Sequence, residues 1–292
     1  MSPAAIALPL SAAFIYVVAT LVIKRAVANG ASSREVNFSV NLAMGVVMQA
    51  FWMLESASPV WWQPLACGIL FFSGQCLTFE ALSRGDVSVA TPLMGTKILF
   101  IALFAAVLFG VDAGWQWWTA IGLSTLAVGL ITLHPGNRRG NNAGFTAILA
   151  VLSAMVFGLT DLLLQVWCEP ETMGRFLATM FIVNAFCSSA WYFVEAPGKW
   201  LPVRAARPWL AGSALLLATQ VVLLAIALSL FNDAAATNIL YASRSLWSVV
   251  LAWWAGKWFG ARDAEAGTMV MGLRLAGAVL LFASIVLIVA GG

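Results

Sequence analysis

The chain has 292 residues, of which 62% are hydrophobic and 9% are charged, and its formal net charge is +3 at pH 7. A soluble domain carries about 25% charged residues, so this composition excludes a water-soluble fold, and the small net charge gives no reason to expect a nucleic-acid partner. It predicts an integral membrane protein whose surroundings are membrane lipids.

Ten apolar segments near the length that a bilayer requires follow one another along the chain. Their connections are short and contain Gly, Pro, Asn and Asp, which end helices. Because backbone polar groups must be satisfied internally in lipid, the segments are expected to be helices of an all-α integral membrane fold with ten transmembrane helices. The segments are 5–27, 37–56, 61–82, 87–109, 115–134, 143–166, 173–195, 208–230, 234–257 and 267–290.

Basic residues are concentrated on one side of this predicted topology. The opposite side holds Arg175 alone. The positive-inside rule therefore predicts that the odd-numbered loops are cytoplasmic and that both termini lie outside. The basic residues of the odd-numbered loops are Lys24, Arg25, Arg34, Arg84, Arg138, Arg139, Lys199, Arg204, Arg207, Lys257 and Arg262.

Short patterns of the first half recur in the second half. With five helices in each half, two such repeats must be inverted relative to each other in the membrane. We therefore expect two inverted five-helix repeats, at 1–137 and 143–292. Such repeats are typical of secondary transporters, whose solute site lies near the midplane between them. The matched positions are 5–12 with 147–154, Gln75 with Gln220, Asp86 with Asp233, and Lys97 with Arg244, at offsets that grow from 142 to 147.

Residues 81–93, Ala-Leu-Ser-Arg-Gly-Asp-Val-Ser-Val-Ala-Thr-Pro-Leu, resemble the hairpin between helices 3 and 4 of EamA-type proteins in the drug/metabolite transporter (DMT) superfamily. Residues 227–238 are a similar second copy. The resemblance implies a ten-helix carrier of amino acids, metabolites, drugs or sugar phosphates, located in the inner membrane of a bacterium. The chain departs from the family pattern at Phe109-Gly110-Val111, where helix 4 usually ends in an acidic residue. Many relatives are also drawn with both termini inside, opposite to the charge-based prediction.

Two cations are expected near the bilayer centre. Lys97 is the eleventh residue of segment 87–109, and Arg244 is the eleventh of segment 234–257. An ionisable residue there costs from about 2.5 to more than 10 kcal/mol, which makes it a functional candidate. The planar fork of Arg and the point charge of Lys suit a carboxylate or phosphate. The alternative is that each cation pairs with Glu80 or Asp161 and only ties helices together.

Other polar residues lie at helical spacing from the two cations or at related places in the two halves. The pattern partly resembles that of sugar-phosphate translocators, which carry a Lys on helix 4 and a Lys-Arg pair on helix 9; here Ser243 and Ser245 flank Arg244. Asp161 and Glu80 are expected to supply a counter-charge or to carry a coupling proton. The predicted solute site comprises Lys97, Arg244, Tyr241, Asn238, Thr96, Gln75 and Gln220.

The sequence thus predicts a secondary transporter that moves a small organic solute bearing a carboxylate or phosphate by alternating access. The alternatives are an exporter of amino acids or neutral amphipathic metabolites, and a flippase for an anionic lipid-linked headgroup. An enzyme is not expected, because the single histidine, His134, lies in a loop and no metalloprotease, P-loop or dinucleotide motif is present. We expect no cofactor and no metal. The expected partners are the solute and lipids, with the chain a monomer or a homodimer.

Overall fold

The computed structural model describes residues 2–53, 58–84, 93–110, 114–132, 143–195, 204–231, 233–244, 246–247, 250–251 and 268–291. Ten helices are assigned within these residues, which confirms the all-α prediction. They are α1 (Pro3–Ala28), α2 (Ser33–Trp52), α3 (Trp62–Arg84), α5 (Lys97–Phe109), α6 (Trp115–Thr132), α7 (Ala143–Trp167), α8 (Met173–Glu195), α9 (Arg207–Phe231), α10 (Ala234–Tyr241) and α12 (Thr268–Gly291).

Several helices have the length and composition of membrane spans. Four of them, α1, α7, α8 and α9, are long and apolar enough to cross a bilayer, and α5 and residues 272–287 of α12 are shorter apolar helices. Large apolar side chains also face outward, such as Val107, Phe186 and Phe282. A soluble protein does not expose so much apolar surface, so the surroundings of these helices are lipid.

Local signals account for where the first two helices begin. The Ser2 hydroxyl accepts a hydrogen bond from the Ala5 amide at 3.3 Å, and Pro3 occupies the first turn of α1, where its missing N–H costs nothing. At the start of α2, Ser32 and Glu35 form a reciprocal capping box. These caps satisfy amide groups that have no partner inside the helix.

Two segments predicted to be continuous helices, 87–109 and 234–257, are irregular near their middles. In the first, α5 begins only at Lys97, after a turn in which the Thr96 hydroxyl donates to the Leu93 carbonyl at 2.5 Å. In the second, α10 ends at Tyr241, and the Ser243 amide bonds the Leu240 carbonyl at 3.1 Å, a tighter i→i+3 contact. In the turn before α5, Gly95 and Thr96 weaken a regular helix. The Thr hydroxyl offers the backbone another hydrogen-bond partner, and Gly has a low helix propensity.

The correction concerns only the continuity of these two helices. The other eight helices begin within four residues of their predicted positions. Residues 87–92 and 252–257 of the two irregular segments lie outside the described residues. The two predicted cations, Lys97 and Arg244, each follow directly after one of the two turns.

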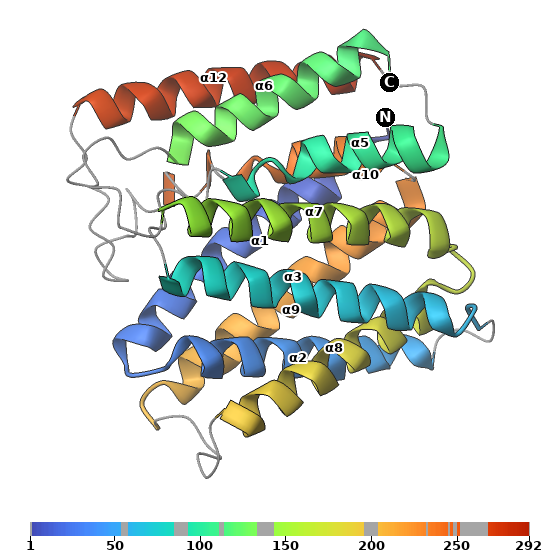
Figure 1. Ribbon diagram of the computed structural model, residues 1–292, viewed down its shortest axis with the longest axis vertical. Coiled ribbons are helices and arrows are strands. Elements are labelled where there is room, and N and C mark those ends of the chain that lie inside the picture. Colours follow the sequence, from blue (N-terminus) through green and yellow to red (C-terminus); the bar gives the residue numbers. More distant parts are fainter. Residues whose placement is uncertain are drawn as a thin grey trace.

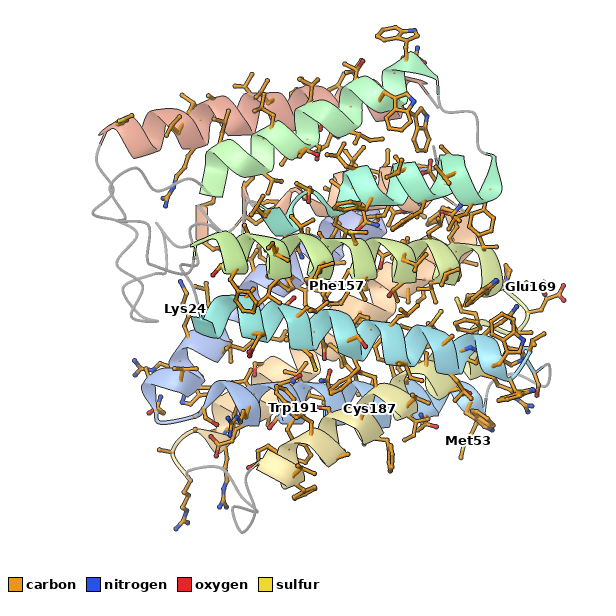
Figure 2. All side chains as sticks on the ribbon, viewed as in Figure 1. Lys24, Met53, Phe157, Glu169, Cys187 and Trp191 are labelled. Atoms are coloured by element: carbon orange, nitrogen blue, oxygen red, sulfur yellow. The ribbon has the colours of Figure 1, made fainter. Side chains whose placement is uncertain are left out.

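The helices pack in pairs drawn from the two halves of the chain, as Figure 1 shows. α1 packs against α9, α3 against α7, α2 against α8, and α6 against α12. Lys24 near the end of α1 and Glu169 just after α7 lie at opposite ends of the bundle in Figure 2, so α1 and α7 run in opposite directions. Both chain termini lie at one end of the helices (Figure 1), as an even number of crossings requires.

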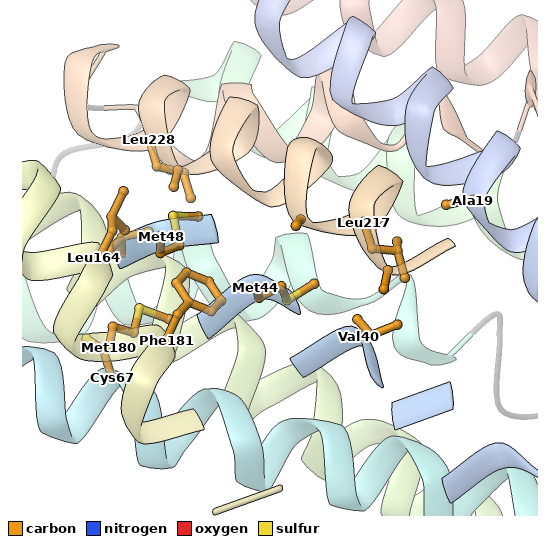
Figure 3. Close-up of a cluster of buried hydrophobic side chains, with 14 of the residues drawn as sticks. Ala19, Val40, Met44, Met48, Cys67, Leu164, Met180, Phe181, Leu217 and Leu228 are labelled. Atoms are coloured by element: carbon orange, nitrogen blue, oxygen red, sulfur yellow. The ribbon is translucent and has the colours of Figure 1, made fainter. Parts of the chain in front are cut away.

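The main core lies among α1, α2, α8 and α9 (Figure 3). Met44 and Met48 of α2 meet Phe181 of α8 and Leu217 and Leu228 of α9, all of them buried. Where α2 crosses α8, a Cβ on Gly45 would lie 2.7 Å from the Ala185 Cβ, closer than real Cβ atoms approach. Glycine at this position therefore sets how closely the two backbones pack.

Candidate functional site

One face of α7 contacts the starts of both irregular helices. Phe157, Asp161 and Gln165 are spaced four residues apart, so they lie on one stripe. The ring of Phe157 lies 6.0 Å from the Lys97 ammonium, and Figure 2 labels Phe157 on α7. The Gln165 side-chain carbonyl accepts from the Ala234 amide at 2.7 Å, at the first residue of α10. The α7 stripe thereby joins the beginning of α5 to the beginning of α10.

Asp161 is at the centre of this stripe and binds residues from both irregular helices. Its Oδ2 lies 2.5 Å from the Lys97 ammonium, and the Asn238 amide nitrogen donates to the same oxygen at 2.8 Å. The side chains of Lys97 and Asp161 are 18% and 9% exposed, so the pair is largely but not fully removed from solvent. A charge pair at this depth is maintained because each partner removes the cost of burying the other.

Arg244 lies in a corner formed by two aromatic rings. Its guanidinium carbon is 4.9 Å from the ring centroid of Tyr16 on α1 and 4.6 Å from that of Tyr241 on α10. The two rings meet at an interplanar angle of 74°. Cation–π attraction holds the guanidinium there and fixes its orientation. Within the described residues, no carboxylate forms a salt bridge with Arg244.

The three charged groups form one electrostatic cluster. Lys97 interacts electrostatically with both Asp161 and Arg244, and Arg244 interacts with Asp161. Since Lys97 and Asp161 neutralise each other, the cluster of Lys97, Asp161 and Arg244 carries one net positive charge. Arg244 is the group that provides it.

A second polar cluster lies between α2, α3 and α8. Asn41 is fully buried; it donates to Gln75 at 2.7 Å and to Ser188 at 3.2 Å, and it accepts from Asn184 at 3.0 Å. Gln75 also donates back to Asn41 at 3.0 Å, and Asn37 completes the set as a further acceptor. We refer to Asn37, Asn41, Gln75, Asn184 and Ser188 as the amide cluster. It ties α2 to α3 and α8.

The predicted site residues divide into two groups in the structure. Lys97, Asp161 and Asn238 are in contact, and Tyr241 contacts Arg244.

The other predicted residues lie elsewhere. Gln75 belongs to the amide cluster, and the Thr96 hydroxyl donates to the Leu93 carbonyl. Gln220 is buried in α9. Glu80 lies in α3 and is not among the contacts of Lys97 or Arg244 in the described part of the chain.

Sequence reasoning missed several residues of the two clusters: Tyr16, Phe157 and Gln165 around the charged groups, and Asn37, Asn41, Asn184 and Ser188 in the amide cluster. Tyr16 and Phe157 are aromatic residues in apolar helices, which composition alone assigns to packing. A weak signal existed for them: both lie in the first helix of a half, 141 residues apart, close to the offset of 142 that relates those helices. Asn41 and Asn184 are amides within apolar runs, and such residues mark interhelical hydrogen bonds.

These features define a multi-pass helical membrane protein with charged groups held between its helices. Residues 3–133 match the model of the EamA-like transporter family, the family that the sequence resembles. This match agrees with the predicted class of function, a small-solute transporter.

The fold likeness extends beyond the family match. One solved crystal structure of a protein superposes with a TM-score of 0.75, covering 98% of this chain and 96% of that chain at 14% sequence identity. At that identity the likeness shows the fold alone, but it includes both halves of the molecule. No curated protein matches the sequence.

Proposed function

We propose that the protein is a secondary transporter that binds the anionic group of a small organic solute at Arg244. The observation that carries this proposal is a guanidinium between helices, held by two aromatic rings, with no carboxylate partner among the described residues. Arg244 is half-buried between the helices, and a charge that has lost part of its water without gaining a counter-ion is costly, so a group that supplies the counter-ion binds favourably.

The corner formed by Tyr16 and Tyr241 favours a planar anionic group. Guanidinium N–H groups point outward in the plane of the group, and a carboxylate or phosphate accepts two of them at once. The rings hold the guanidinium in one orientation, so little rotamer freedom is lost when the solute binds. Lys97 is engaged by Asp161, which leaves Arg244 as the cation that binds the solute.

The helix pairing supports two inverted repeats as the basis of transport. If α1 corresponds to α7, and α3 to α9, then the contact of α1 with α9 has a counterpart in that of α7 with α3. Likewise, α5 packs on α7 as α10 packs on α1. In the same correspondence α2 matches α8 and α6 matches α12, so exchanging the two halves maps each of these pairs onto itself. The axis relating the halves would therefore pass between the two helices of each pair. The solute site at two irregular helices also fits this class of transporter.

Residue spacing supports the same axis between α2 and α8. Asn37 and Asn184 are 147 residues apart, as are Asn41 and Ser188, and this is the offset between Lys97 and Arg244. The same offset matches Gly45 with Tyr192 and Phe38 with Ala185. The Gly45–Ala185 contact at one end of the α2–α8 pair therefore corresponds to the Phe38–Tyr192 stack at the other end, where the ring centroids are 4.7 Å apart. One end is closely packed and the other is spaced by aromatic rings. Alternating access would exchange these two arrangements.

Ligand binding to purified protein tests the anion site. Thermal-shift titration against amino acids, organic phosphates and carboxylates should find a stabilising anion, because stabilisation grows with ligand concentration over Kd. Arg244→Gln should remove that stabilisation, while Lys24→Gln, which removes an exposed cation at the end of α1, should leave it unchanged. Equal binding by Arg244→Gln and wild type would show that the solute is held elsewhere.

A further inference from the structure

Asp161 has a position that a simple anion site does not require. It lies within the same electrostatic cluster as Arg244, and its negative charge opposes the binding of any anion there. It nevertheless accepts from Lys97 and from Asn238 through one oxygen, so its carboxylate is held in place from two helices. The Asp161 carboxylate is therefore a fixed part of the site around Arg244.

The consequence of this charge can be counted. Lys97 and Arg244 together would present two positive charges, and Asp161 reduces the total to one. The two cations are 147 residues apart, the offset that relates this part of the two halves, whereas Asp161 has no acidic counterpart in α1, where the offset of 142 falls on Ala19. The cluster is thus asymmetric in charge although its cations are paired.

We infer that Asp161 determines the charge selectivity of the transporter, restricting its solutes to singly charged anions such as monocarboxylates. This inference rests on the proposed function, since it takes Arg244 as the group that binds the anion. A monoanion brings the cluster to neutrality. A dianion leaves one negative charge without a partner between the helices, which is costly where the surroundings are poorly solvated.

Asp161 acts here as a specificity-determining residue that sets the net charge around Arg244. The role is separate from holding the helices together, because removal of Lys97 and Asp161 as a pair leaves the net charge of the cluster unchanged. A double-variant cycle can therefore separate charge from structure. The four relevant states are wild type at +1, Asp161→Asn at +2, the double variant Lys97→Met with Asp161→Asn at +1, and Arg244→Gln at 0.

The test measures Kd by calorimetric titration with matched anions, benzoate against terephthalate and butyrate against succinate. Wild type should bind the monoanion of each pair at least about tenfold more tightly than the dianion. Asp161→Asn should reverse this preference. The double variant should restore it, although it also lacks Asp161. A merely structural role for Asp161 would weaken all four ligands together and leave the ratio unchanged.

Each outcome bears on one of the two proposals. If Asp161→Asn keeps the wild-type ratio while Arg244→Gln loses binding, Arg244 stands as the anion site and the inference about Asp161 is overturned. If Arg244→Gln binds all four ligands as wild type does, or if wild type binds none of them, the proposed site falls and the inference falls with it. If Asp161→Asn does not fold, wild type and the double variant still decide, because a preference for the dianion in either contradicts the inference.

Discussion

Lys97 and Asp161 form an ion pair, with Nζ 2.5 Å from Oδ2, between helices on either side of the chain's midpoint. Lys97 is the first residue of α5, and Asp161 lies within α7. Because the pair joins the two halves of the molecule, a change in its geometry accompanies any relative movement of α5 and α7.

The stability of the protein should depend on the balance of this pair. Among the described residues, Lys97→Met leaves the Asp161 carboxylate with the Asn238 amide as its one remaining partner, and loss of one partner of a buried pair costs about 3–5 kcal/mol. The double variant Lys97→Met with Asp161→Asn removes both charges and should recover most of that loss. Thermal unfolding in detergent measures both variants. A single variant as stable as wild type would mean that the pair is not maintained in the membrane protein.

Tyr16 should contribute to anion binding through its ring. Tyr16→Leu removes one wall of the corner around Arg244, and cation–π contacts contribute about 0.5–2 kcal/mol, so Kd for the anion should rise by roughly two- to thirtyfold. Tyr16→Phe keeps the ring and should bind nearly as wild type does. Calorimetric titration of both variants provides the comparison. If Tyr16→Phe were the weaker binder, the hydroxyl would be the important group.

Gly45 should control the packing of α2 against α8. Gly45→Ala places a methyl group 2.7 Å from the Ala185 Cβ and 3.2 Å from the Phe181 carbonyl, and such overpacking costs about 1–3 kcal/mol. Gly122→Ala on α6 is the matched control, since its Cβ would meet nothing within 4 Å, and it should stabilise the helix by up to about 1 kcal/mol. Thermal unfolding that ranks the two variants in the opposite order would contradict the close contact.

The orientation predicted from the basic loops can be tested at residues whose positions the structure gives. Lys24 and Glu169 are both exposed and lie at opposite ends of the bundle (Figure 2). On a background without native cysteines, Glu169→Cys should react with an impermeant thiol reagent in intact cells, and Lys24→Cys should react only after lysis. The reverse pattern would place the termini in the cytoplasm and contradict the charge-based prediction.

Much of the fold could be predicted because the bilayer imposes it. Ten runs of spanning length, and the recurrence of Lys97 as Arg244 after 147 residues, are properties of the sequence alone. The same reasoning placed Tyr241 beside Arg244, and its ring does contact the guanidinium, whereas Asn238 donates to Asp161 instead. It also assumed that both helices continue regularly past their cations.

The partners of the cations depend on tertiary packing, which spacing within one helix does not reveal. Both Glu80 and Asp161 were candidates for Lys97, and only the approach of α7 to α5 selects Asp161. That approach uses Gly158, where an added Cβ would lie 3.2 Å from the Lys97 carbonyl. Gln75 joins the amide cluster for the same reason: its neighbour Asn41 is 34 residues away in sequence.

Transport by alternating access should leave a kinetic signature in proteoliposomes. We use the monoanion that binds most tightly in the titrations, with protein-free liposomes as the blank for passive leak. Uptake should saturate with concentration, and unlabelled anion on the far side should accelerate efflux of labelled anion. The reason is that a bound anion favours the change between the two arrangements, so the loaded transporter reorients faster than the empty one. Arg244→Gln should abolish both effects. Single-channel currents, or a flux that rises linearly without saturation, would indicate an open pore instead.

Asp161 is also the residue expected to couple transport to protons. If its carboxylate carries a proton across, a pH gradient should drive accumulation of the anion in wild type. The double variant Lys97→Met with Asp161→Asn keeps the net charge of the cluster but has no group left at this position to protonate. It should therefore retain exchange of a monoanion and lose accumulation. Accumulation that persists in the double variant would assign coupling to another residue and leave Asp161 with charge selectivity alone.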